Sequence, residues 1–143
     1  MKPSLRSLAL GAATILLTAI PSLAQAPQRL ILDAPFDFEL QGAVMPAGQY
    51  SLVTSNGLLT LKNIAEPKHT VMSIVRTDLY QTPRATSAEF NKVGSHHYLR
   101  QIYAGATETA WIIPASAAER ESTPGVTVAK VVLKLKYNTG GGQ

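Results

Sequence analysis

Side chains suited to molecular recognition lie close together in the second half of the chain. Aromatic rings with polar tips, placed near a guanidinium, suit contacts with sugars, peptides or aromatic metabolites. A histidine, two tyrosines and an arginine occur on a predicted hairpin, and the one tryptophan of the chain follows shortly after them. The candidate ligand or partner contacts are therefore His97, Tyr98, Arg100, Tyr103 and Trp111.

The alternative is that the same residues only build the fold. Because side chains alternate along a strand, Tyr98 and Ile102 would lie on one face, and Leu99 and Tyr103 on the other. Trp111 would then cover one end of the domain. This interpretation needs no ligand.

The spacing of the remaining polar residues does not favour other site chemistries. Adjacent histidines on a strand point to opposite faces, so His96 and His97 cannot both bind one metal ion, and His69 lies in a separate loop. No serine stands in a G-x-S-x-G motif. Asp37 and Glu39 are spaced as charged residues on an outward strand face usually are. We therefore predict a protein that is not an enzyme and that has neither a metal ion nor a cofactor.

The composition predicts a folded domain rather than a disordered chain. Of 143 residues, 45% are hydrophobic and 15% are charged, and there is no cysteine to form a disulfide or bind a metal. The net charge is +4; if Lys2 and Arg6 are removed with the N-terminal segment, 11 of the 13 basic residues face 9 acidic ones and the charge falls to +2. So small a charge argues against binding to nucleic acid.

Residues 1–24 are typical of a secretory signal peptide. Basic residues precede an uncharged run at 7–20, which is too short to span a bilayer. We expect cleavage between Ala24 and Gln25, because the competing site after Ala26 would place a proline next to the scissile bond. The alternative is an N-terminal anchor that stays uncleaved. No later stretch is long enough for a second span, so we expect a secreted or periplasmic protein whose mature chain has no membrane span.

From residue 29 onward apolar and polar residues alternate with a period of two, which is typical of half-buried strands. Asn56-Gly57 between two such runs predicts a tight hairpin, because both residues accept positive φ angles. Residues 116–122 predict one short helix, and 78–88 predict a loop. Strands are expected at 33–40, 49–54, 58–63, 70–77, 89–93, 96–103, 111–113 and 126–137.

The number of short strands and their even spacing predict a fold class. Turn signals at intervals of about eight to twelve residues indicate an antiparallel β-sandwich or a small β-barrel. We expect a single β-domain at 27–137 and a flexible glycine-rich tail at 138–143.

Two motifs resemble those of small exported proteins from acidobacteria. Residues 35–38 (P-F-D-F) match P-F-x-F, and residues 45–50 (M-P-A-G-Q-Y) match L-P-A-G-x-Y with methionine in place of leucine. Segments 90–103 and 113–121 correspond to the hairpin and the charged segment that such proteins tend to have further along the chain. This family has no established activity, so the resemblance implies a β-fold and an exported location, and no catalytic residues.

These observations favour an exported, non-enzymatic β-domain that serves as a structural or interaction module of the cell envelope, with another envelope protein as partner. The alternative is a protein that binds a small apolar or aromatic molecule, or a sugar, in a barrel mouth or between the sheets. An apolar cavity of about 300 Å³ or more near Trp111 would favour the small-ligand protein, and a filled interior would favour the module.

Overall fold

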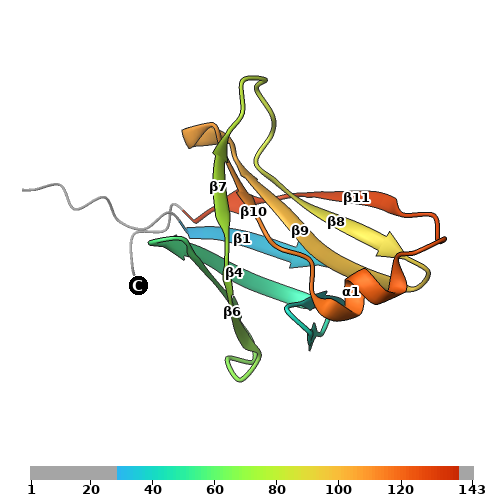
Figure 1. The fold of residues 1–143 in the computed structure, drawn as a ribbon. Helices are drawn as coiled ribbons and strands as arrows, with labels where there is room; N and C mark the ends of the chain where they lie inside the picture. The colour runs from blue at the N-terminus through green and yellow to red at the C-terminus, as the bar shows by residue number, and fades with distance from the viewer. Residues whose placement is uncertain (1–28, 139–143) are drawn as a thin grey trace, which may run out of the picture.

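Alternating apolar side chains build two β-sheets that pack face to face (Figure 1). The computed structural model describes residues 29–138; the predicted signal peptide at 1–24 and most of the predicted tail lie outside them. The prediction of a mainly β, antiparallel fold with one short helix is confirmed, and the two packed sheets have the arrangement of a β-sandwich.

One sheet has five strands. In spatial order they are β12 (Lys136–Tyr137), β1 (Arg29–Ala34), β4 (Gly48–Ser55), β5 (Leu58–Asn63) and β6 (Thr70–Ile74), and each is antiparallel to its neighbour.

The other sheet has seven strands. Its main order is β11 (Ala129–Lys134), β8 (Ser87–Val93), β9 (His96–Ala104), β10 (Thr109–Ile112) and β7 (Arg76–Leu79). The short hairpin of β2 (Phe38–Leu40) and β3 (Ala43–Met45) joins it through a parallel contact between β2 and β9. Residues 29–138 contain two helical segments, the 3₁₀ turn η1 (Gly105–Thr107) and the helix α1 (Ala117–Ser122).

The core lies between the inner faces of the sheets, and aromatic rings occupy its centre. Phe38 meets Tyr50 and Phe90 edge to face, with ring centroids 5.2 Å and 5.5 Å apart. The Tyr50 hydroxyl donates a hydrogen bond to the carbonyl of Pro46, which satisfies its polar tip. Because Pro46 and Tyr50 belong to the M-P-A-G-Q-Y motif, that motif has a packing role in this fold.

The hairpin predicted from Asn56-Gly57 is confirmed. Both residues have positive φ angles, 51° and 74°, and they join β4 to β5 in continuous antiparallel register. The residues that follow confirm the strand predicted at 58–63, with Leu59 and Leu61 fully buried.

Two predicted strands cross from one sheet to the other instead of continuing in the same sheet. Residues 70–77 divide at Val75 into β6 and the start of β7, and residues 126–137 divide at Leu135 into β11 and β12. Both dividing residues are buried, so each continues the inward alternation of the strand before it. A period-two pattern therefore cannot distinguish a crossing from an uninterrupted strand.

The strand predicted at 33–40 is also divided. β1 ends at Ala34 and β2 begins at Phe38, with a bend between them. Pro35 follows the end of β1, and proline has no N–H to continue the pairing of a strand. The chain therefore leaves the five-stranded sheet here and enters the other one.

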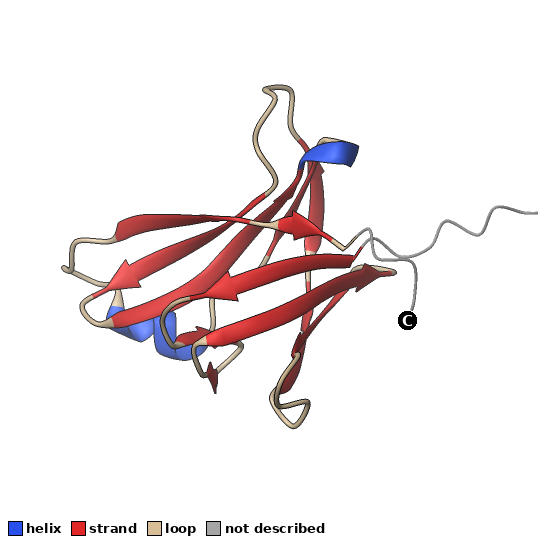
Figure 2. Ribbon diagram, turned by 180° about the vertical axis from the view of Figure 1, so that it is seen from behind, coloured by secondary structure: helices blue, strands red, loops and turns tan. Residues whose placement is uncertain are grey.

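The outer face of the seven-stranded sheet is covered at its two ends. Figures 1 and 2 show α1 near one end of β8 and β9, and the loop that follows β7 near the opposite end. This loop spans 80–86 and is shorter than the predicted 78–88, because β7 extends to Leu79 and β8 starts at Ser87. No helix within residues 29–138 is both long enough and apolar enough to cross a membrane.

Candidate functional site

An irregularity in β9 decides which way the predicted contact residues face. The register with β8 leaves Arg100 without an opposite residue, so Arg100 is the extra residue of a β-bulge. Such a bulge shifts the alternation of side chains by one position. Tyr98, Arg100 and Tyr103 consequently share the outer face, whereas Leu99 and Ile102 lie in the core. The expected pairing of Tyr98 with Ile102, and of Leu99 with Tyr103, is wrong for this reason.

His97 lies on the opposite side of β9 and packs against Phe36. The two rings are stacked, with centroids 3.8 Å apart and planes 12° from parallel. Its Nδ1 atom is buried and has no hydrogen-bond partner among residues 29–138. Burial, and to a lesser extent the positive charge of Lys92, lowers the pKa of His97. The structure thus separates His97 from the tyrosines and the arginine.

Trp111 is also separated from them. It lies in β10 opposite Ile102, belongs to the core cluster and is only 6% exposed. Its indole ring fills the interior between the sheets.

The two tyrosines of the outer face are covered by neighbouring segments. The Tyr98 hydroxyl lies 3.3 Å from the Ser122 hydroxyl of α1. Arg84 donates to the Tyr103 hydroxyl at 3.0 Å and lies over its ring, and Tyr80 packs edge-on against the same ring at 5.4 Å. Exposed fractions of 4% for Tyr98 and 7% for Tyr103 leave neither ring a free face on which a sugar or an aromatic ligand can stack.

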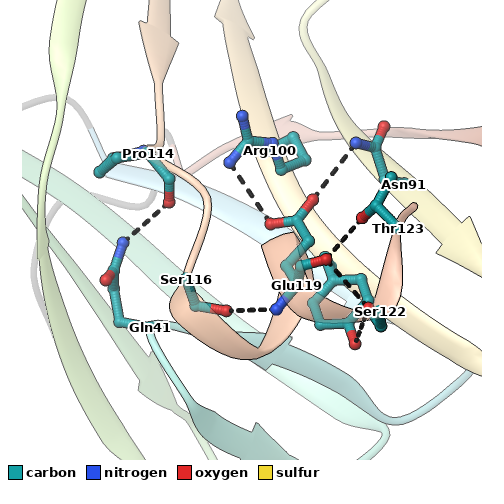
Figure 3. Close-up of polar contacts among 9 residues, drawn as sticks. Gln41, Asn91, Arg100, Pro114, Ser116, Glu119, Ser122 and Thr123 are labelled. Atoms are coloured by element: carbon teal, nitrogen blue, oxygen red, sulfur yellow. Dashed lines mark hydrogen bonds and ion pairs between the residues drawn. The ribbon is translucent and has the colours of Figure 1, made fainter.

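Arg100 reaches the side of α1 that faces the sheet, where it meets Glu119. Arg100 Nη1 donates to Glu119 Oε2 at 3.4 Å, and Asn91 Nδ2 donates to Glu119 Oε1 at 3.3 Å (Figure 3). Both distances are near the upper limit for a hydrogen bond. Because a guanidinium carries five N–H donors, Arg100 keeps donors beyond the one that contacts Glu119.

The sequence of α1 explains how Glu119 comes to face the sheet. Ser116 caps the helix, with its hydroxyl accepting from the backbone N–H of Glu119 at 3.2 Å. In a capping box the glutamate at this position turns back to the capping serine. Here its carboxylate extends to β8 and β9 instead, while its backbone carbonyl accepts from the hydroxyls of Ser122 and Thr123 (Figure 3).

An open hollow of about 440 Å³ lies between α1 and the sheet, and we call it the α1 hollow. The segment before the helix is fixed by a hydrogen bond of 3.0 Å from Gln41 Nε2 to the carbonyl of Pro114 (Figure 3). Apolar groups and charged groups share the surface of the hollow. Its lining includes Asn91, Arg100, Ala115, Glu119, Arg120 and Pro124.

A second hollow, of about 280 Å³, lies on the same outer face beside the loop at 80–86. Gln101, which follows Arg100, lines it together with Arg84 and Tyr103. The two hollows are therefore neighbours along β9. Burial raises the pKa of Tyr80, which also lines the second hollow.

The sequence indicates Arg100 as a contact residue, but it does not indicate Asn91 or Glu119. The only sequence signal at Glu119 is its S-x-x-E spacing from Ser116, which predicts a helix cap and not a contact with a strand. Asn91 has no signal of its own, because a polar residue on a hairpin strand is ordinarily solvated.

Two of the three histidines form separate pairs with carboxylates. His69 lies 3.2 Å from Glu66, and His96 lies 3.6 Å from Glu39. Within the part of the chain that the structure describes, no three residues among His, Cys, Asp and Glu are grouped so that they could hold a metal ion.

Comparisons with known proteins found no relative of this chain. The chain matches no protein-family model, no curated protein and no solved structure.

Proposed function

We propose that the chain is an exported, non-enzymatic interaction module of the cell envelope that binds a partner protein at the α1 hollow. The observation that carries the proposal is the position of Arg100. Arg100 alternates with Tyr98 on the outer face, so its guanidinium enters the hollow, where it keeps hydrogen-bond donors that Glu119 does not use. Carboxylate and backbone carbonyl oxygens of a protein segment are the acceptors that suit such donors.

The exported location is supported by the sequence alone. Residues 1–24 have the charge and length pattern of a signal peptide, and the P-F-D-F and M-P-A-G-Q-Y motifs resemble those of exported acidobacterial proteins. Because the chain has no cysteine, it needs no disulfide formation after export.

The proposal of a non-enzymatic role is supported by the positions of the side chains whose pKa is shifted. Burial raises the pKa of Tyr50 and Tyr80 and lowers that of His97. Tyr50 packs against Phe38 in the core, Tyr80 lines the second hollow, and His97 packs against Phe36 at the edge of a third hollow, so the three groups do not line one cleft. Catalytic acids and bases converge on one cleft, whereas these groups have separate packing roles.

The alternative is a small molecule in the same α1 hollow. Its volume of about 440 Å³ lies in the range of ligand pockets. Because the ring faces of Tyr98 and Tyr103 are covered, such a molecule would bind by hydrogen bonds to Arg100 and not by stacking. This favours a carboxylate-bearing molecule over a sugar or an aromatic compound.

A cross-linking experiment tests the proposal. Arg120, an exposed residue at the hollow, is replaced by a photo-cross-linking amino acid in the full chain, and the protein is irradiated in an extract of its own cell envelope. We expect one protein adduct. It should disappear when Ala115→Trp fills the hollow and weaken strongly when Arg100→Gln removes the charge.

The matched control is Ala118→Trp, which adds the same side chain at an exposed position of α1 outside the hollow. An adduct that persists in Ala115→Trp, or that is lost equally in Ala118→Trp, would contradict the proposal. If no protein adduct forms but mass spectrometry finds a small molecule released from the parent chain and not from Ala115→Trp, the alternative is correct. Circular dichroism of each variant verifies the fold.

A further inference from the structure

The outer face of the five-stranded sheet lies on the other side of the sandwich and has a different character. Antiparallel partners share a face, so the register places Lys136, Ile31, Ser51 and Lys62 in one row across the strands. A neighbouring row contains Arg29, Val53, Thr60 and Met72. We call this surface the basic face.

Asp33 is exposed on the same face of β1, but within residues 29–138 the cations of the basic face form no ion pair with it or with any other acidic residue. Arg29 and Lys62 line a hollow of about 320 Å³ above Ile31 and Ser51, and no acidic residue lines this hollow. Within residues 29–138, no ion pair involves Arg29, Lys62 or Lys136. In contrast, Lys130 on the outer face of the other sheet pairs with Glu89 at 3.1 Å.

Exposed apolar side chains lie on the same face. Ile64, Met72 and Ile74 are 49%, 56% and 75% exposed. Met72 and Ile74 belong to β6, the outermost strand of the sheet, which has no charged residue. Large exposed apolar side chains gathered beside cations are typical of a surface that binds a membrane or another protein.

We propose that the basic face binds an anionic phospholipid surface. Arg29 and Lys62 would hold lipid phosphate groups at the hollow, and Met72 and Ile74 would enter the layer between head groups and acyl chains. A free anion would need only the hollow and would leave the exposed residues of β6 uncovered. A neutral apolar partner would cover those residues but would desolvate the cations without compensation. An anionic membrane surface would bind the cations and would also cover the exposed apolar residues of β6.

This proposal does not rest on the α1 hollow, since the two surfaces belong to different sheets. The test is cosedimentation of the full chain with vesicles of phosphatidylcholine containing phosphatidylglycerol, and with vesicles of phosphatidylcholine alone. We expect binding to the anionic vesicles that weakens as salt is added. Each cation near an anionic surface strengthens binding by about fivefold, so Arg29→Gln with Lys62→Gln should weaken it by about 25-fold.

The matched control for charge is Lys92→Gln with Lys134→Gln, two exposed lysines of the other sheet. It removes the same net charge and should leave binding within about twofold of the parent chain, because these lysines do not face the membrane. All variants carry the same N-terminus, verified by mass spectrometry, so differences between them report on the basic face. Equal losses in the two charge variants would overturn the proposal, as would a difference that persists on phosphatidylcholine alone.

A second pair of variants tests the apolar contribution. Met72→Thr with Ile74→Thr keeps residues that favour strands and should weaken vesicle binding even at high salt. Leu79→Thr with Val132→Thr, exposed residues of the other sheet, should not. If the chain binds no vesicles while inorganic phosphate shifts the amide resonances of Ser51 and Lys62, the hollow takes a free anion and the membrane proposal is wrong.

Discussion

The carboxylate of Glu119 in α1 lies 3.4 Å from the guanidinium of Arg100, the extra residue of the bulge in β9. This contact joins the only α-helix of residues 29–138 to the centre of the seven-stranded sheet. The helix has six residues, too few to be stable in isolation, so its position depends on such contacts. The shape of the α1 hollow therefore depends on Glu119.

Replacing Glu119 by alanine should lower the free energy of unfolding by about 1–2 kcal/mol. The change leaves Asn91 and Arg100 without their shared acceptor, although water can reach Arg100 and reduces the loss. The midpoint of urea denaturation measures the effect.

Glu121→Ala is the control for this prediction, because Glu121 lies on the same helix and is exposed. Its effect should stay within about 0.5 kcal/mol. Similar losses for the two variants would show that the ion pair does not hold the helix.

The pH dependence of stability should include a contribution from His97. Burial lowers its pKa below the ordinary value of 6.5, so in the pH range just below 6.5 the unfolded chain binds a proton that the native state does not. Stability is therefore full above the unfolded pKa and is lost as the pH falls through this range. Urea denaturation at a series of pH values from about 8 to about 5 measures the loss, since carboxylates titrate mainly below it.

His97→Phe should remove this contribution. Phenylalanine can keep the stacking on Phe36 and has no buried nitrogen without a partner, so the cost at neutral pH should be less than about 1.5 kcal/mol. His69→Gln, a change in a surface loop, should retain the pH dependence. A variant with phenylalanine at position 97 whose stability still falls as steeply below pH 6.5 would contradict the assignment.

The strands and turns of this fold were predictable where local chemistry decides them. Asn56 and Gly57 adopt the positive φ angles that the hairpin needs, and Ser116 caps the helix predicted at 116–122. The crossings at Val75 and Leu135 were not predictable, because each continues the alternation of the strand before it. Which sheet a segment joins depends on partners distant in sequence.

In the candidate site, too, local sequence predicts some features, whereas others depend on partners distant in sequence. The sequence identifies Arg100 as a polar residue among aromatic ones, but it contains no signal for the bulge that places Tyr98 and Tyr103 on one face. The bulge arises from the pairing of β8 with β9, which is a relation between strands. The sequence does not indicate the role of Glu119, because its side chain contacts a strand that is distant in sequence from the helix.

The fluorescence of Trp111 distinguishes a residue that fills the core from one that contacts a ligand. It is the only tryptophan, so excitation selective for indole reports on this position alone. With its side chain packed between the sheets, native emission should lie at short wavelength and iodide should quench it weakly, whereas quenching should be strong after unfolding in urea. Trp111→Ala should also lower the free energy of unfolding by about 3–5 kcal/mol, because a large buried side chain leaves a cavity. Strong quenching of the native protein, together with a loss below about 1 kcal/mol, would instead place the indole at the surface as a contact residue.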